Sequence, residues 1–327
     1  MRTRRTFFTV FWGATALLLA LLLSFSASAR FAAGFDAAVG VRVRLAVSSI
    51  SSLVPFSLTE LLLLLLPLFF LFMIYALLRT KNSRNPTRVL FSLFLSLSLL
   101  FGLGFAAGEY RPPLGETLGL SVEAPTVEEV AECTRWVSGL ATYSGEVPSD
   151  GELTARLLAA FRRAGERYGL PANTAACPKE TATPLLSRLG YFGLYAFPLG
   201  EITVTAECPS AVRTFTAAHE LAHASGLRRE EEADAFAFLV CLESGDPYLR
   251  YAAATGVLGR LLTEMKTEEP TAWQDASTWV TDEARRELGE AGELCGDASE
   301  TVVLPTPEYG ETVRLLCALY RSRLAGK

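Results

Sequence analysis

Acidic residues are almost missing from the first third of this sequence. Only Asp36, Glu60 and Glu109 occur among residues 1–109, which also contain ten lysines or arginines and so carry a net charge of +7. Residues 110–327 carry −12, which makes the total −5. Because this second part has no excess of Lys and Arg for binding phosphates, the composition argues against a nucleic-acid-binding protein. Half of all residues are hydrophobic, which excludes a disordered chain.

Charged residues are nearly absent from three long apolar runs, at about residues 6–29, 59–78 and 89–108. A helix needs about 20 apolar residues to cross a bilayer, so each run predicts a transmembrane helix. Pro67 interrupts the second run, which a membrane helix tolerates when its neighbours satisfy the freed carbonyl. Residues 1–109 are therefore predicted to be a membrane domain, with the lipid bilayer as partner.

Basic residues flank these runs unevenly. Seven precede the first run or lie between the second and third, against four on the opposite side. The positive-inside rule then places the amino terminus and residues 79–88 in the cytoplasm. This predicts a multi-pass protein of the cell membrane whose C-terminal domain is extracytoplasmic. Residues 27–29 resemble a signal-peptidase site, but the run is long for a cleaved signal, which favours a retained anchor.

Cysteine is absent from the membrane domain, and no two cysteines have the CxxC spacing of a cysteine-based zinc site. An even number of cysteines outside the cytoplasm permits disulfides, although the sequence does not choose among the 15 possible pairings. Buried free thiols are the alternative. All six cysteines follow the membrane domain: Cys133, Cys177, Cys208, Cys241, Cys295 and Cys317.

Residues 110–125 contain several Pro and Gly and are predicted to be a linker to a domain at residues 126–327. The alternating β-branched stretch 201–205 predicts a short strand. The fold class is therefore mainly α: three transmembrane helices followed by a helix-rich domain with a small β-sheet or hairpin. Hydrophobic periodicity and end signals predict the helices of this domain at about 127–141, 151–168, 210–225, 230–243, 247–266, 277–290 and 308–324.

Histidine is the scarcest informative residue, because the chain contains only His219 and His223. Their spacing of four places both imidazoles on one face of a helix, one turn apart, where both can bind the same metal ion. Glu220 follows the first histidine and stands beside that ion, where a general base can take a proton from zinc-bound water. The HExxH pattern also arises by chance, but here it holds every histidine of the chain.

A catalytic zinc ion takes three protein ligands and keeps one position for water. No third histidine exists, so the remaining ligand must be a carboxylate. Glu230 and Asp234 share a face of the next predicted helix, and we expect Glu230 to bind the metal while Asp234 hydrogen-bonds the outer nitrogen of a histidine. Glu232 is the alternative ligand. Acidic residues at the start of a helix also complement its dipole. The alternative to metal binding is therefore that the acids at 230–234 only stabilise the helix.

Two supporting roles remain open at this stage. The strand Ile202–Thr205 closely precedes the HExxH helix and is the candidate edge for pairing with an extended peptide substrate; a structural hairpin is the alternative. An anionic transition state also needs a hydrogen-bond donor beyond the metal. Tyr195, Arg250 and Tyr251 are the candidates, each of which would otherwise be a packing or surface residue.

The pattern Glu230-x-x-x-Asp234 after His219-Glu220-x-x-His223 resembles the gluzincin arrangement of zinc peptidases, which implies that Glu230 is the third zinc ligand and that Asp234 supports a histidine. A second resemblance lies in seven stretches: Pro55–Leu58, Glu109–Pro113, Pro178-Lys179, Gly193–Glu201, His219–Gly226, Glu230–Asp234 and Arg250-Tyr251. Through them, nearly the whole chain resembles the membrane family known as domain of unknown function 3810, which implies a membrane-anchored, zinc-peptidase-like protein and no particular substrate.

These patterns together predict a membrane-anchored metallopeptidase that hydrolyses peptide bonds in a peptide or protein substrate, with Zn²⁺ as cofactor and Glu220 as general base. The alternative is a membrane metalloprotein that acts as a sensor or scaffold with a vestigial peptidase site, although the short loop 79–88 leaves no room for a signalling domain. A structural zinc module would need a fourth protein ligand. An intramembrane protease is disfavoured because the motif lies far beyond the last apolar run.

Overall fold

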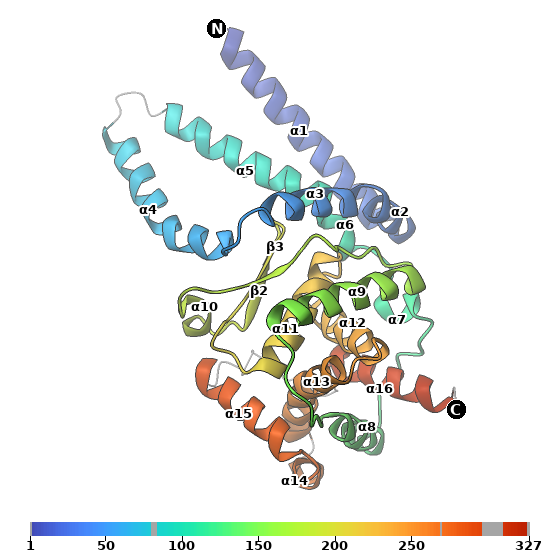
Figure 1. The fold of residues 1–327 in the computed structure, drawn as a ribbon. Coiled ribbons are helices and arrows are strands. Elements are labelled where there is room, and N and C mark those ends of the chain that lie inside the picture. Colours follow the sequence, from blue (N-terminus) through green and yellow to red (C-terminus); the bar gives the residue numbers. More distant parts are fainter. Residues whose placement is uncertain (1, 80–83, 269, 296–309, 326–327) are drawn as a thin grey trace.

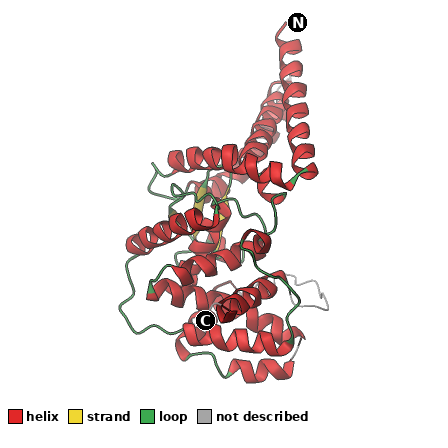
Figure 2. Ribbon diagram, turned by 90° about the vertical axis from the view of Figure 1, so that its right-hand side faces the viewer, coloured by secondary structure: helices red, strands yellow, loops and turns green. Residues whose placement is uncertain are grey.

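The computed structural model describes residues 2–79, 84–268, 270–295 and 310–325. The protein is mainly helical with one small sheet, as predicted (Figure 2). Three helices are long and apolar enough to cross a membrane: α1 (Arg2–Ala27), α4 (Leu58–Arg79) and α5 (Arg84–Gly104). They extend from one end of the molecule, and the sheet and most of the other helices form the other end, the outer domain (Figure 1).

A helical segment that the sequence analysis did not predict connects α1 to α4. It comprises α2 (Ala29–Phe35), the π-helical turn η1 (Asp36–Gly40) and α3 (Val41–Ser51). The side chain of Ser28 caps its first turn by accepting a hydrogen bond from the backbone N–H of Phe31 (3.2 Å). The segment lies between the membrane helices and the outer domain (Figure 1), and we call it the juxtamembrane segment.

The first residues of the predicted linker 110–125 pack against the rest of the protein, whereas most residues from 116 to 125 are exposed. Two short helices, α6 (Ala106–Glu109) and α7 (Leu114–Thr117), follow α5, and Arg111 and Leu114 are buried. A Cβ atom on Gly115 would collide with Val122, so this glycine serves close packing rather than flexibility. Phe105 at the end of α5 belongs to the same hydrophobic core as Leu114. The membrane part and the outer domain therefore share a core.

Most predicted helices of the outer domain are found within three residues of their expected ends. The exception is the predicted helix 277–290, because one helix ends at Ser277 and the next begins at Asp282. The hydroxyl of Thr281 caps this second helix by accepting a hydrogen bond from the N–H of Ala284 (3.2 Å). The predicted start of the last helix, at residue 308, lies outside the described residues. The helices are α8 (Val127–Leu140), α9 (Asp150–Tyr168), α10 (Leu185–Arg188), α11 (Ser210–Ala224), α12 (Glu230–Glu243), α13 (Pro247–Glu268), α14 (Pro270–Ser277), α15 (Asp282–Cys295) and α16 (Glu311–Ala325).

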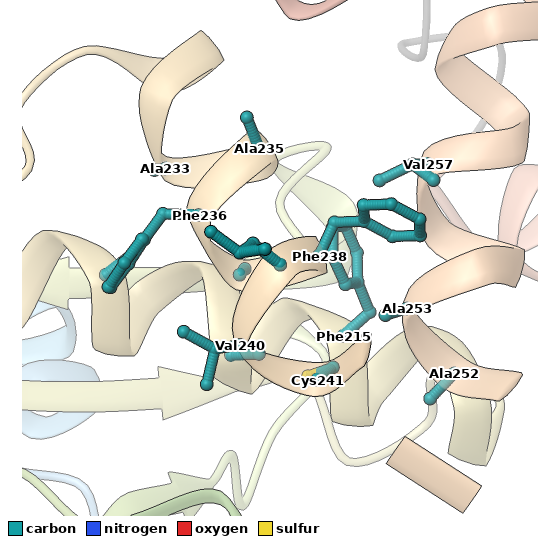
Figure 3. Packing of buried hydrophobic residues seen from close by; sticks show 14 of the residues in the cluster. Phe215, Ala233, Ala235, Phe236, Phe238, Val240, Cys241, Ala252, Ala253 and Val257 are labelled. Carbon is teal, nitrogen blue, oxygen red and sulfur yellow. The ribbon is translucent and has the colours of Figure 1, made fainter. Parts of the chain in front are cut away.

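Large aromatic side chains and small residues alternate where α11, α12 and α13 pack together (Figure 3). Phe236 and Phe238 on α12 are each 1% exposed or less, and Ala252 and Ala253 on α13 are fully buried. Helix α12 is buried on nearly every side, and apart from Asp234 its residues from Ala233 to Leu242 are all hydrophobic. This packing fixes α11 against α12, the two helices that carry the predicted site residues.

The sheet has three short strands: β1 (Pro178–Glu180), β2 (Gly193–Ala196) and β3 (Glu201–Val204). The strand order is β1-β3-β2, with β1 parallel and β2 antiparallel to β3. The predicted strand exists as β3, but it is central, fully buried and paired on both sides. Its expected role as a substrate-binding edge is therefore wrong, because β2 occupies the edge beside α11.

Candidate metal centre

Both histidines lie on α11, and their Nε2 atoms are 3.0 Å apart. The helix ends just after His223, where Gly226 adopts a φ of +104°, a conformation that favours glycine. The N–H of Leu227 then donates to the carbonyl of Ala222 (3.1 Å). This tight reversal lets α12 begin at Glu230, directly beside the imidazoles.

Glu230 completes a group of three possible ligands. Its Oε2 lies 3.0 Å from Nε2 of His219 and 3.3 Å from Nε2 of His223. Among the described residues, this is the one group of three or more His, Cys, Asp or Glu whose ligand atoms lie within 4.8 Å of one another. The Glu230 side chain is 68% exposed and the imidazoles are 11–12% exposed, so the group opens to solvent on the Glu230 side. Two imidazoles and one carboxylate, open on one side, suit a zinc ion that keeps a position for water.

The outer nitrogen of each histidine has a hydrogen-bond partner. Nδ1 of His219 lies 2.7 Å from Oδ1 of Asp234, whose other oxygen pairs with Nε of Arg260 at 3.2 Å. Nδ1 of His223 lies 2.7 Å from the backbone carbonyl of Leu227. A carbonyl only accepts hydrogen bonds, so His223 must carry its proton on Nδ1. The lone pair of its Nε2 is then directed at the point where the two Nε2 atoms and Oε2 of Glu230 converge.

Strong charge coupling surrounds these groups. Burial lowers the pKa of His219, but the carboxylates of Asp234 and Glu230 outweigh it and raise that pKa to about 10. The hydrogen bond from His219 and the neighbouring imidazole of His223 hold the pKa of Glu230 well below its usual range. Burial raises the pKa of Asp234, but the neighbouring His219 outweighs burial and lowers it. The acceptors around the two imidazoles therefore favour a positive charge at this position.

Glu220 lies on the side of α11 that packs against strand β2. It is 7% exposed, and burial raises its pKa, while His219 and His223 oppose that effect and the N–H of Tyr195 favours the ionised form. A Cβ atom on Gly193 would lie only 3.3 Å from Cγ of Glu220 and 2.5 Å from Cγ2 of Thr216. The strand can approach α11 this closely because residue 193 is glycine.

The structure does not bring the alternative ligand Glu232 to this group. The Glu232 side chain is buried, and its Oε1 accepts from the N–H of Leu114 (2.8 Å) and pairs with Arg229 (3.3 Å). It lies on another face of α12, one that holds the segment after α6. Glu232 is therefore a structural residue.

The suggested hydrogen-bond donors are found in other surroundings. The ring of Tyr195 packs against Phe105, with centroids 5.7 Å apart. Tyr251 stacks on Tyr143 at 6.0 Å, and Arg250 is exposed. These contacts match the packing and surface roles that the sequence analysis left as the alternative.

Sequence reasoning missed three parts of this centre: strand β2, Arg260 and the carbonyl of Leu227. The run of aromatic residues 191–197 before a Pro-Leu-Gly turn is typical of a strand and could have located β2. A backbone carbonyl has no side-chain signal, so only Gly226 marks the turn that presents Leu227. Arg260 comes from α13, and nothing in the local sequence connects it to Asp234.

Comparison with protein-family models matches residues 42–303 to the family described as protein of unknown function (DUF3810). This match covers most of the chain. The chain belongs to the DUF3810 family. The matched region of this DUF3810 protein begins in α3 and includes α4, α5, the sheet and the HExxH helix, so it covers most of the membrane part and the candidate metal centre. Comparisons with curated proteins and with solved structures found no match.

Proposed function

We propose that this DUF3810 protein is a membrane-anchored, zinc-dependent metallopeptidase in which His219, His223 and Glu230 hold the metal. The observation that carries the proposal is the convergence of two Nε2 atoms and one Oε2 atom within 3.0–3.3 Å of one another. The hydrogen bonds to both Nδ1 atoms support it, since they orient the imidazoles as a metal requires. When bound, zinc supplies Lewis acidity that activates water and polarises a peptide carbonyl.

Glu220 is the proposed general base and acid. Its buried carboxylate takes a proton from the attacking water and returns it to the leaving amine. Two features support this role: burial, which raises the pKa of Glu220, and the N–H of Tyr195, which favours its ionised form. The low exposure of Glu220 also limits competing exchange with bulk water.

Strand β2 is the proposed docking edge for the substrate. Phe192 accepts a hydrogen bond from Thr205 (2.8 Å), so alternate residues of β2, Leu194 and Ala196, face β3 in the ladder. The N–H and C=O groups of Gly193 and the C=O of Tyr195 consequently point to the other edge, where the N–H of Tyr195 donates to Glu220. An extended peptide that pairs with this edge would bring its backbone next to the general base.

We place the outer domain outside the cytoplasm. The amino terminus, the end of α4 and the start of α5 all lie at the end of the membrane helices that is remote from the outer domain (Figure 1). Seven basic residues cluster near these positions in the sequence, which favours the cytoplasmic side for that end. The substrate would then be a peptide or protein exposed at the outer face of the membrane.

Replacing Glu220 by Gln tests the mechanism. The amide keeps the size of the side chain but cannot take a proton, so peptidase activity should fall by roughly 10²–10⁴-fold while zinc binding is retained. The full-length protein in detergent would be assayed with a peptide library, with Glu231→Gln on α12 as the matched control. Full activity of the Glu220→Gln variant would exclude this mechanism.

A further inference from the structure

A buried ion pair in the juxtamembrane segment lies beneath the turn between α11 and α12. The Arg44 side chain is fully buried and Asp36 is 3% exposed. Each terminal nitrogen of the guanidinium donates to one oxygen of the carboxylate, with Nη1–Oδ1 at 2.5 Å and Nη2–Oδ2 at 3.1 Å. Asp36 is the first residue of the π-helical turn η1 and Arg44 follows in α3; such turns are rare and often occur at functional sites. Burying two charges is costly, so this arrangement needs an explanation beyond stability.

Arg44 joins the end of a membrane helix to the end of the HExxH helix. Its Nη1 donates to the carbonyl of Gly104, the last residue of α5 (2.7 Å). Its Nη2 donates to the carbonyl of Ser225, just after α11 (3.3 Å). Both helices leave carbonyls without helical partners at this end, and one guanidinium supplies donors to both.

The turn after α11 fits closely around this ion pair. A Cβ atom on Gly226 would lie 2.7 Å from Nη2 of Arg44 and 3.0 Å from Oδ2 of Asp36. From the other side, a Cβ atom on Gly108 would lie 2.5 Å from the carbonyl oxygen of Gly226. The turn is thus enclosed between the juxtamembrane segment and the residues that follow α5.

The same turn presents the carbonyl that orients a metal ligand. Leu227 comes two residues after Ser225, and its carbonyl holds Nδ1 of His223 at 2.7 Å. A continuous set of contacts therefore leads from Arg44, through Ser225 and Gly226, to Leu227 and His223. Displacement of the turn would move the Leu227 carbonyl and change the direction of the imidazole.

We propose that Arg44, paired with Asp36, is a positioning residue of the metal centre, so that the juxtamembrane segment and the end of α5 are structural parts of that centre. Arg44 acts through the turn and does not contact the ligands. This inference rests on the proposed function, because it assumes that His219, His223 and Glu230 bind a metal. It goes beyond that function by making the membrane part a requirement for metal affinity.

The test uses the full-length protein in detergent with Zn²⁺ and Co²⁺ as probes. In Arg44→Lys the positive charge remains opposite Asp36. A single ammonium group, however, cannot donate to the carbonyls of Gly104 and Ser225 as the two guanidinium nitrogens do. We expect zinc affinity, measured by chelator competition, to fall by about 10–100-fold, as for other residues that orient ligands. The visible absorption of the Co²⁺ form should change as well. Arg42→Lys is the matched control, since Arg42 is exposed on the same helix, and it should leave both readouts unchanged.

A second variant separates positioning from stability. Replacing the pair by apolar residues, Asp36→Leu with Arg44→Met, removes both charges and should keep the protein folded. It should nevertheless bind zinc as weakly as Arg44→Lys, with thermal unfolding confirming that both variants are folded at the assay temperature. Wild-type zinc affinity and an unchanged Co²⁺ spectrum in these folded variants would overturn the inference alone. A wild-type protein that binds neither metal would overturn the proposed function itself.

Discussion

The two histidines of the proposed metal centre are held by acceptors of different kinds. Asp234 gives His219 a charged partner, whereas His223 relies on the neutral carbonyl of Leu227. A carboxylate strengthens the basicity of the imidazole that it holds, so the pair His219–Asp234 should contribute more to metal affinity. The second oxygen of Asp234 forms an ion pair with Nε of Arg260 at 3.2 Å.

Replacing Asp234 by Ala should weaken zinc binding by about 10–100-fold, because His219 loses the partner that fixes its tautomer and ring orientation. Asp234→Asn should lose less zinc affinity, because its amide oxygen still accepts a hydrogen bond from Nδ1–H of His219. Chelator competition on the full-length protein would measure both affinities. Equal affinity of Asp234→Ala and wild type would show that Asp234 does not support the metal centre.

At the scale of helices and strands, local patterns predicted the metal-centre helices well. His219, His223 and Glu230 lie on two consecutive helices, so their spacing in the sequence was enough to predict that they lie close together. Strand β1 was missed because it pairs with residues distant in the sequence, such as Lys179 with Thr203. Strand β2 pairs with β3 across a short turn, and its aromatic run could have located it. Arg44 was missed for the same reason as β1, since 181 residues separate it from Ser225.

The contact between β2 and α11 predicts a specific effect of Gly193→Ala. The added methyl group would lie 2.5 Å from Thr216 and 3.3 Å from Glu220, so the strand must move away from the proposed general base. We expect a loss of about 1–3 kcal/mol in the free energy of unfolding from this overpacking. Peptidase activity should fall while zinc content stays at the wild-type level.

The matched control is Gly139→Ala on α8, where no atom would contact the added methyl group. Its activity should equal that of wild type, and its stability should be unchanged or slightly higher because Ala favours a helix. Thermal unfolding and activity would be measured for both variants. Wild-type activity of Gly193→Ala would contradict the proposed placement of β2 at the substrate edge.

On the scale of the whole molecule, the membrane helices and the outer domain are bound together at several points. The start of α4 is fixed to the sheet, because Glu201 on β3 accepts from the N–H of Thr59 (2.8 Å) and from Nζ of Lys179 (2.6 Å). Glu60 accepts in turn from the N–H groups of Ala182 and Thr183. With the Arg44 contacts, these bonds make the chain one structural unit.

The junction at Glu201 should be sensitive to pH. Burial raises the pKa of Glu201, but the hydrogen bonds from Lys179 and Thr59 outweigh it and hold the pKa below its ordinary value of 4.5. A lowered folded-state pKa means that the ionised carboxylate stabilises the folded protein above pH 4.5, and that this stabilisation is lost as the pH falls further.

Glu201→Gln should therefore lower the free energy of unfolding by about 1–3 kcal/mol at neutral pH, because the buried ammonium of Lys179 loses its charged partner. The difference in melting temperature between wild type and variant should shrink as the pH is lowered below 4.5. Thermal unfolding across this range measures it. A difference that stays constant with pH would show that the charge of Glu201 does not stabilise the junction.

The most direct test of the central proposal is the metal content of the purified full-length protein, measured by elemental analysis in wild type and Glu230→Ala. The full chain is needed because Phe105 of the membrane part lies in the core of the outer domain. The proposal predicts one zinc ion per wild-type chain and loss or strong weakening of binding in the variant. A wild-type protein that binds no zinc after reconstitution would contradict it, and His219 and His223 would then be ordinary helix residues.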